Sequence, residues 1–270
     1  MFGFLRRKPP KLAPFAEAKP RTFTPLLCDG LTAHPLPGFA DLLSLHARLQ
    51  REHSDVHVLA SLDDLGQALY TSGHGIDLHG LDDVEGHDLS ALDPQVFEDG
   101  EHQGYLSTPA EFPIRLANLL ERARDVQIDQ ISGLLEWETP GDANDLVTIN
   151  KNPDAALGIG RDEVLFQFVP VATAAEAIAA FPNGYFQSDL DPMQNYALAR
   201  HLETRYGLAL FGVGSRMLGF RRQVVLDEDA ARALAADLAG LYANAPAEAT
   251  ASLTRVLAGR SWLLIRYTES

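Results

Sequence analysis

The sequence predicts an α+β fold in which helices back mixed or antiparallel sheets. Helix-like and strand-like hydrophobic periodicities follow one another along the 270 residues, and the C-terminal part has the order β-α-β-β-α-β. The chain is 46% hydrophobic, so it can bury one substantial core or two small ones. Its 22% of charged residues is ordinary for a folded protein. No stretch approaches the roughly 18–20 apolar residues that cross a bilayer.

Composition predicts three regions. Residues 1–21 are expected to form a flexible basic arm, because this stretch is rich in proline, lysine and arginine. Residues 22–160 are expected to form an acidic α/β region, and residues 161–270 a C-terminal α+β domain. The first residues lack the order of a secretory signal, and the only cysteine, Cys28, leaves no intramolecular disulfide to form. We therefore expect a cytoplasmic protein.

In the acidic region, periodicity predicts a strand over 22–28, a helix over about 38–53, a strand over 56–60 and a short helix around 62–69. Glycines interrupt residues 72–104, which predicts a loop.

A helix start follows at Thr108, since Pro109 occupies the first helical position and Glu111 completes a capping box. This helix is expected to run to about Arg124. Strands are then predicted over 126–137 and 146–149.

The last third has the most regular pattern. It predicts helices over 172–180, 191–207, 227–242 and 248–257, and strands over 164–170, 208–213, 216–222 and 261–267. Without the additional helices, these elements have the split βαβ order, which favours a helix-backed mixed or antiparallel sheet.

Four features of this C-terminal layout are also typical of a known family. They are the strand from Val164, the Arg205-Tyr206-Gly207 helix end, the strand from Leu208 and the closing Trp262. With these features, residues 164–267 resemble a bacterial domain-of-unknown-function family, catalogued as four-two-five-three. The resemblance implies a bacterial source and no established activity. The family typically closes with tryptophans and an aspartate, whereas this chain has Ile265, Arg266 and Tyr267, so the role of that aspartate is not carried over.

Charge is distributed unevenly along the chain. Residues 52–114 contain fourteen Asp and Glu but no Lys or Arg, and they supply nearly all of the formal net charge of −15. A coherent negative surface of this kind speeds and selects encounters with a cationic partner. We therefore predict a non-enzymatic acidic protein-binding module with a basic protein partner. An immunity or antidote protein against a basic toxin is one example, and a regulator or adaptor would have the same features. The predicted contacts are Asp77, Asp82, Asp83, Glu85 and Asp88.

Two alternatives remain open. The segment 74–88 contains His74, His79 and His87 among carboxylates, as a metal-dependent enzyme would need, although it lacks known metal-ligand spacings such as His-Glu-x-x-His. A scaffold protein whose acidic residues confer only solubility is the other alternative. Nucleotide-binding and nucleophile-elbow motifs are absent from the sequence, so we predict no catalytic residue and no cofactor. The net negative charge disfavours nucleic-acid binding by the folded body.

Three further side chains are predicted to be structural or solvated. His46 falls on the apolar face of its helix and is expected to be a hydrogen-bonded residue at the edge of the core. His201 is expected on the surface. Cys28 is expected to be a packed thiol.

Overall fold

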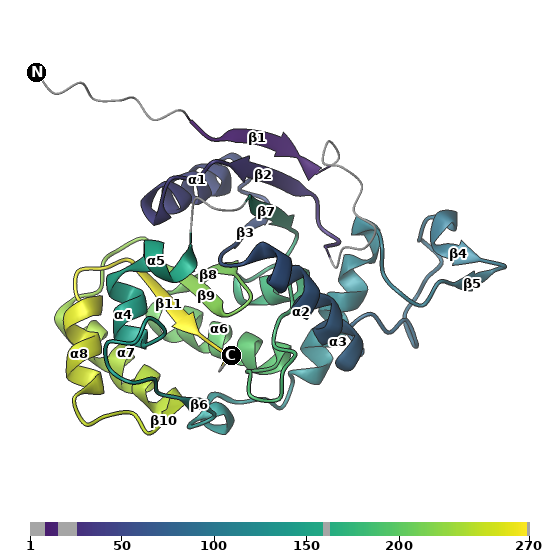
Figure 1. The fold of residues 1–270 in the computed structure, drawn as a ribbon. Helices are drawn as coiled ribbons and strands as arrows, with labels where there is room; N and C mark the ends of the chain where they lie inside the picture. The colour runs from purple at the N-terminus through teal and green to yellow at the C-terminus, as the bar shows by residue number, and fades with distance from the viewer. Residues whose placement is uncertain (1–8, 16–25, 159–162, 269–270) are drawn as a thin grey trace, which may run out of the picture.

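The centre of the molecule is a seven-stranded sheet (Figure 1). The structure is a computed structural model that describes residues 9–15, 26–158 and 163–268. Neighbouring strands are antiparallel except for the pair β3 and β8, which makes the sheet mixed, as the α+β prediction requires. In spatial order the strands are β1 (Lys11–Pro14), β2 (Gly30–His34), β7 (Val164–Val169), β3 (His57–Ser61), β8 (Ala209–Val213), β9 (Met217–Arg221) and β11 (Trp262–Arg266).

Helices cover both faces of this sheet. Successive strand side chains point to opposite faces, and in β3 Val58 and Ala60 belong to one hydrophobic cluster while Leu59 belongs to the other. The first cluster includes α1 (Phe39–Glu52) and α5 (Pro153–Leu157). The second includes α2 (Leu65–Leu78), α3 (Phe112–Arg122), α6 (Pro192–Tyr206), α7 (Glu228–Leu241) and α8 (Ala249–Leu257). Burial on both faces explains the nearly continuous apolar run of β7.

The C-terminal elements follow the predicted order along the chain. The four predicted strands and the helices near 191–207, 227–242 and 248–257 are confirmed, while the helix predicted over 172–180 is a 3-10 helix, Ala175–Ala180. In the sheet, however, β3 of the acidic region lies between β7 and β8. The predicted regions 22–160 and 161–270 therefore contribute strands to one shared sheet.

Two predictions near the N-terminus need correction. Within the predicted arm, Lys11–Pro14 form edge strand β1, which pairs antiparallel with β2; the other residues of 1–21 lie outside the described residues except 9, 10 and 15. An edge strand tolerates proline because one row of its N–H groups has no ladder partner. The strand predicted over 22–28 begins instead at Gly30, and residues 22–25 lie outside the described residues. A Cβ on Gly30 would lie 2.1 Å from the Phe166 carbonyl oxygen, so the close pairing of β2 with β7 requires this glycine.

Three predictions for the middle of the chain need correction, because helix replaces strand or loop in all or part of each segment. Residues 146–149 belong to α4 (Leu146–Lys151), whose first backbone N–H groups donate to the Asp145 carboxylate. Residues 126–137 contain a 3-10 helix, Ile128–Ile131, and only a two-residue strand, β6 (Leu135–Glu136), which pairs with β10 (Tyr242–Ala243). Helix α2 continues nine residues beyond the predicted end at 69.

A small hairpin projects from the body of the molecule (Figure 1). It consists of β4 (Phe97–Glu98) and β5 (Glu101–His102), preceded by a 3-10 helix, Pro94–Val96. Its two-residue loop, Asp99-Gly100, has positive φ at both positions, as tight hairpin turns require. In the described part of the chain, each helix is too short or too polar to cross a membrane.

Candidate partner-binding surface

Helix α3 holds the acidic segment, which we define as residues 77–101, against the body. Arg115 is almost fully buried and donates to both oxygens of Asp82, from Nε at 2.6 Å and from Nη2 at 3.0 Å. The backbone N–H of Leu106 also donates to this carboxylate, at 3.3 Å. A bidentate pair at a buried guanidinium fixes geometry strongly. Asp82, predicted as a partner contact, instead anchors the segment, and we leave it out of the contact set proposed below.

Asn118 on the same helix makes a second anchor. Its Nδ2 donates to the carbonyl oxygens of Leu81, at 2.9 Å, and Asp83, at 2.7 Å. Its Oδ1 accepts from Nε2 of His87, at 2.9 Å. His87, a candidate metal ligand, therefore holds the acidic segment against α3 through its Nε2.

A third anchor ties the projecting hairpin to the start of α3. Glu111 is fully buried and accepts hydrogen bonds from the backbone N–H groups of Ser107 and Thr108 and from the Thr108 hydroxyl, which confirms the predicted capping box. Its other oxygen lies 2.8 Å from Nε2 of His102 on β5. Burial raises the pKa of Glu111, but these hydrogen bonds outweigh it and the net pKa is lowered.

The three histidines of the metal hypothesis do not converge. The His74 ring lies between those of Tyr70 and Tyr185, and His79 is the C-cap residue of α2, where its backbone N–H donates to the Asp77 and Gly75 carbonyl oxygens. Across residues 9–15, 26–158 and 163–268, no group of three His, Cys, Asp or Glu side chains could hold a metal ion.

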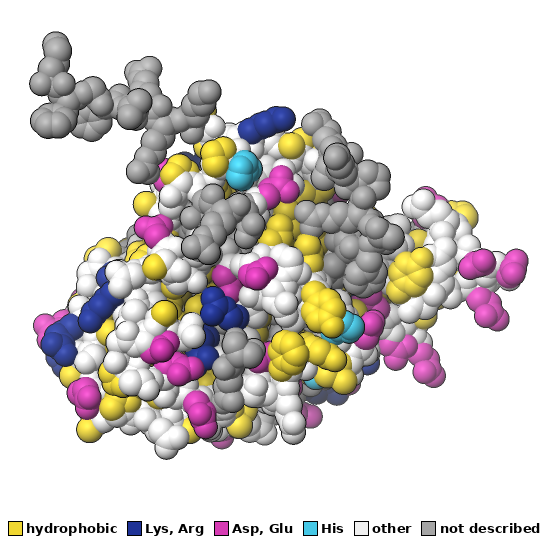
Figure 2. Space-filling model, in the orientation of Figure 1, with side chains coloured by type: hydrophobic (Ala, Val, Ile, Leu, Met, Phe, Trp, Pro, Cys, Tyr) yellow, Lys and Arg dark blue, Asp and Glu magenta, His cyan; other side chains and the backbone are white. Residues whose placement is uncertain are grey.

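Most carboxylates of the acidic segment reach the surface. In Figure 2, acidic side chains gather on the projecting hairpin and at its base. Asp83 has an arginine nearby, with 4.0 Å between its carboxylate and Arg122 Nη2. The Asp88 carboxylate accepts from the Ser90 backbone N–H, which lowers the pKa of Asp88 and keeps it charged. The exposed acidic residues are Asp77, Asp83, Glu85, Asp88, Asp93, Glu98, Asp99 and Glu101.

An aromatic chain, defined as Tyr70, His74, Tyr185 and Phe186, lies beside this segment. Its successive ring centroids are 4.4, 5.0 and 5.1 Å apart. Tyr70 is 57% exposed, Phe186 42%, and Leu78 at the end of α2 62%. Figure 2 shows hydrophobic side chains gathered on the same face as the acidic side chains. Exposed apolar groups in one patch, next to charged groups, are typical of a protein-interaction surface.

Sequence reasoning missed this aromatic chain. Tyr70 and His74 are four residues apart and share a helix face, but that signal requires α2 to extend beyond 69. Tyr185 and Phe186 come from a loop more than 100 residues away in sequence. Contacts between distant segments leave no periodic pattern in a single sequence.

The remaining predicted side chains are located as follows. His46 is buried and its Nε2 lies 2.7 Å from the Val58 carbonyl oxygen, which confirms its prediction. Cys28 is buried, as predicted, and burial raises the pKa of its thiol to about 12. The surface position predicted for His201 is wrong in part: its ring is half-buried and its Nε2 lies 2.9 Å from the Asp237 carboxylate.

No protein family, curated protein or solved structure that was compared with the chain matches it. The resemblance of residues 164–267 to the family of unknown function therefore stays a prediction.

Proposed function

We propose that this protein is a non-enzymatic protein-binding module that recognises a basic partner protein. The observation that carries the proposal is the aromatic chain, in which exposed Tyr70 lies on α2, the helix that leads into the acidic segment, and exposed Phe186 lies on a loop beside it. A few residues carry most of the binding energy at protein interfaces, and tyrosine is enriched among them, while charged groups around them supply encounter rate and selectivity. Asp77, Asp83, Glu85 and Asp88 are the proposed acidic contacts. A cytoplasmic location is proposed as well, supported by the absence of any second cysteine in the sequence.

The projecting hairpin supports a cationic partner independently. Its register places Glu98 directly opposite Glu101. Like charges at opposite positions of an antiparallel pair destabilise it, and no Lys or Arg occurs in residues 52–114 to offset them. A basic partner would relieve this repulsion on binding. A toxin-neutralising antidote, a regulator and an adaptor would all use such a surface, and the partner's identity separates them.

Capture of partners from a lysate of the source organism, at low and at high salt, tests the proposal. We compare the wild type with Tyr70→Ser/Phe186→Ser, which removes exposed rings, and with Asp77→Asn/Asp83→Asn/Glu85→Gln/Asp88→Asn, which removes exposed charge. The matched control removes four exposed charges elsewhere: Asp55→Asn/Asp125→Asn/Asp129→Asn/Glu136→Gln. The proposal requires a basic protein that the wild type and the control capture and that both surface variants lose.

Glu101→Lys provides the sharpest variant. It replaces the like-charge pair with an opposite-charge pair, so it should stabilise the hairpin by up to about 1 kcal/mol while weakening partner capture. A loss of capture would then not be attributable to unfolding. Unchanged capture by either the double aromatic variant or the fourfold acidic variant would refute the proposed function.

A further inference from the structure

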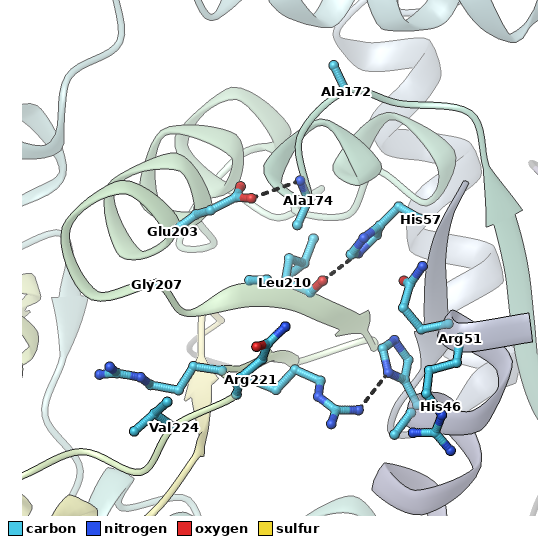
Figure 3. Close-up of a pocket in the computed structure, with 15 residues that line it drawn as sticks. His46, Arg51, His57, Ala172, Ala174, Glu203, Gly207, Leu210, Arg221 and Val224 are labelled. Atoms are coloured by element: carbon cyan, nitrogen blue, oxygen red, sulfur yellow. Dashed lines mark hydrogen bonds between the residues drawn. The ribbon is translucent and has the colours of Figure 1, made fainter. Parts of the chain in front are cut away.

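A pocket of about 830 Å³ opens where α1 and α6 end and β3 and β8 begin. None of its lining residues belongs to the aromatic chain or to the acidic segment. Figure 3 shows Arg221 reaching from β9 toward His46 of α1, with Arg51 beside them and His57 and Glu203 on other walls. Arg222 completes the set of charged lining residues.

Arg221 is held in a fixed position within this pocket. Its Nη1 donates to the Leu43 carbonyl oxygen at 3.3 Å and to Nδ1 of His46 at 3.0 Å. His46 Nε2 donates in turn to the Val58 carbonyl oxygen, and because Nδ1 accepts from the guanidinium, the ring is the neutral tautomer with its proton on Nε2. Burial, together with the nearby Arg221 charge, lowers the pKa of His46 to about 3. The guanidinium is thus oriented by a neutral histidine and a carbonyl, neither of which balances its charge.

The pocket concentrates positive charge in an acidic protein. Among the described residues, Arg51, Arg221 and Arg222 have no carboxylate within ion-pair distance. Both Arg51 and Arg221 line the pocket, and Figure 3 shows them on the same side of it, next to His46. Burial lowers the pKa of Arg221, and the charge of Arg51 lowers it further. Glu203 is the acidic residue of the lining, and its two oxygens accept from the backbone N–H groups of Ala174 and Ala175, at 3.2 and 3.0 Å.

We propose that this pocket binds the phosphate group of a small organic phosphate. Guanidinium groups match phosphate oxygens in charge and in hydrogen-bond geometry, and a dianion balances two neighbouring arginines where a single carboxylate balances one. The apolar lining seats the organic part, as small-molecule sites require. It consists of Ala47, Ala172, Ala174, Ala209, Leu210 and Val224.

Calorimetric titration with phenyl phosphate, at fixed ionic strength in chloride, tests this site. We expect saturable binding that inorganic phosphate displaces, and weaker binding of benzoate, which has the same ring and one negative charge. Arg51→Gln and Arg221→Gln should each weaken phenyl phosphate at least about tenfold, since each removes charge-assisted hydrogen bonds. Arg48→Gln is the matched control, because Arg48 lies on α1, outside the lining, and pairs with Glu52.

The outcomes separate a ligand site from a structural one. If Arg51 only interacts with the end of α1, phenyl phosphate will bind Arg51→Gln as tightly as it binds the wild type. That result would overturn the proposal. So would benzoate binding as tightly as phenyl phosphate, or no saturable binding of phenyl phosphate up to about 10 mM. Arg51 is exposed, so Arg51→Gln remains informative even if the loss of the Arg221 contacts unfolds the protein.

Discussion

His46 shows how a single titratable side chain is made part of the core. Its ring is 2% exposed and lies between the Val58 carbonyl oxygen and the Arg221 guanidinium. One partner accepts the Nε2 proton and the other donates to Nδ1, so only the neutral tautomer satisfies both. A second proton would place a positive charge beside Arg221 in a buried site.

This arrangement predicts a pH-dependent stability. The pKa of His46 is about 3 in the folded state and about 6.5 in the unfolded chain, so the unfolded state takes up a proton first as the pH falls. The stabilisation is complete above the unfolded value and is lost on acidification toward 3, by at most about 1.4 kcal/mol per pH unit. The burial-lowered pKa of His57 acts in the same direction.

Urea unfolding at several pH values between 7.5 and 4.5 measures this slope. His46→Gln keeps a donor for Val58 and an acceptor for Arg221 but does not titrate, so its slope should be smaller by about 1 kcal/mol per pH unit. Equal slopes in the variant and the wild type would show that His46 does not control the acid response.

At the scale of elements, local signals were predictable and tertiary ones were not. The Thr108–Glu111 capping box and the strand from Val164 depend on residues close in sequence, and both are confirmed. Helix α4 was predicted as a strand because a short run such as Leu146-Val-Thr-Ile149, with three apolar residues and a β-branched threonine, suits either state when its apolar residues are buried. Helix α2 was predicted too short because its glycines favour a loop locally, whereas its buried face stabilises the helix in the fold.

The same distinction applies to the candidate surface. The lack of cations in residues 52–114 is visible in the sequence, and most of the predicted contact residues are indeed exposed. The sequence could not show that Arg115 would pair with Asp82, which lies 33 residues earlier in the chain. Nor could it show that the loop 182–186 would complete the aromatic chain.

The conformation of that loop depends on Gly184, which has φ of +110°. A Cβ at this position would lie 2.0 Å from the Leu190 carbonyl oxygen. Gly184→Ala should therefore destabilise the protein by at least about 1–3 kcal/mol and displace Tyr185 and Phe186 from the aromatic chain. Thermal unfolding measures the first effect and partner capture the second. Gly133→Ala is the control: Gly133 also has positive φ, but nothing lies within 4 Å of its added Cβ, so a similar loss there would assign the cost to backbone strain alone.

At the scale of the whole molecule, two groups of charges of opposite sign lie in different places. The carboxylates of the acidic segment lie on and around a projecting hairpin, whereas Arg51, Arg221 and Arg222 line a pocket formed by α1, β9 and neighbouring elements. The anchors on α3 hold the acidic segment in place although its charges repel one another. The two proposals use these places separately: the negative surface for a basic protein and the positive pocket for a small anion.

The self-repulsion of the acidic segment can be measured without a partner. Exposed like charges repel over about 30 Å at 0.01 M salt but only about 3 Å at 1 M. Unfolding lets the carboxylates of the segment move apart, so added sodium chloride should stabilise the folded state, on the order of 1 kcal/mol between these limits. The variant Asp77→Asn/Asp83→Asn/Glu85→Gln/Asp88→Asn should gain less from salt than the wild type, while the four-charge control with Asp55→Asn should respond like the wild type. Urea unfolding across a salt series gives the three slopes. If the stability of the two variants responds equally to salt, the negative potential is spread over the molecule. The acidic segment would then attract a basic partner no more strongly than the rest of the surface.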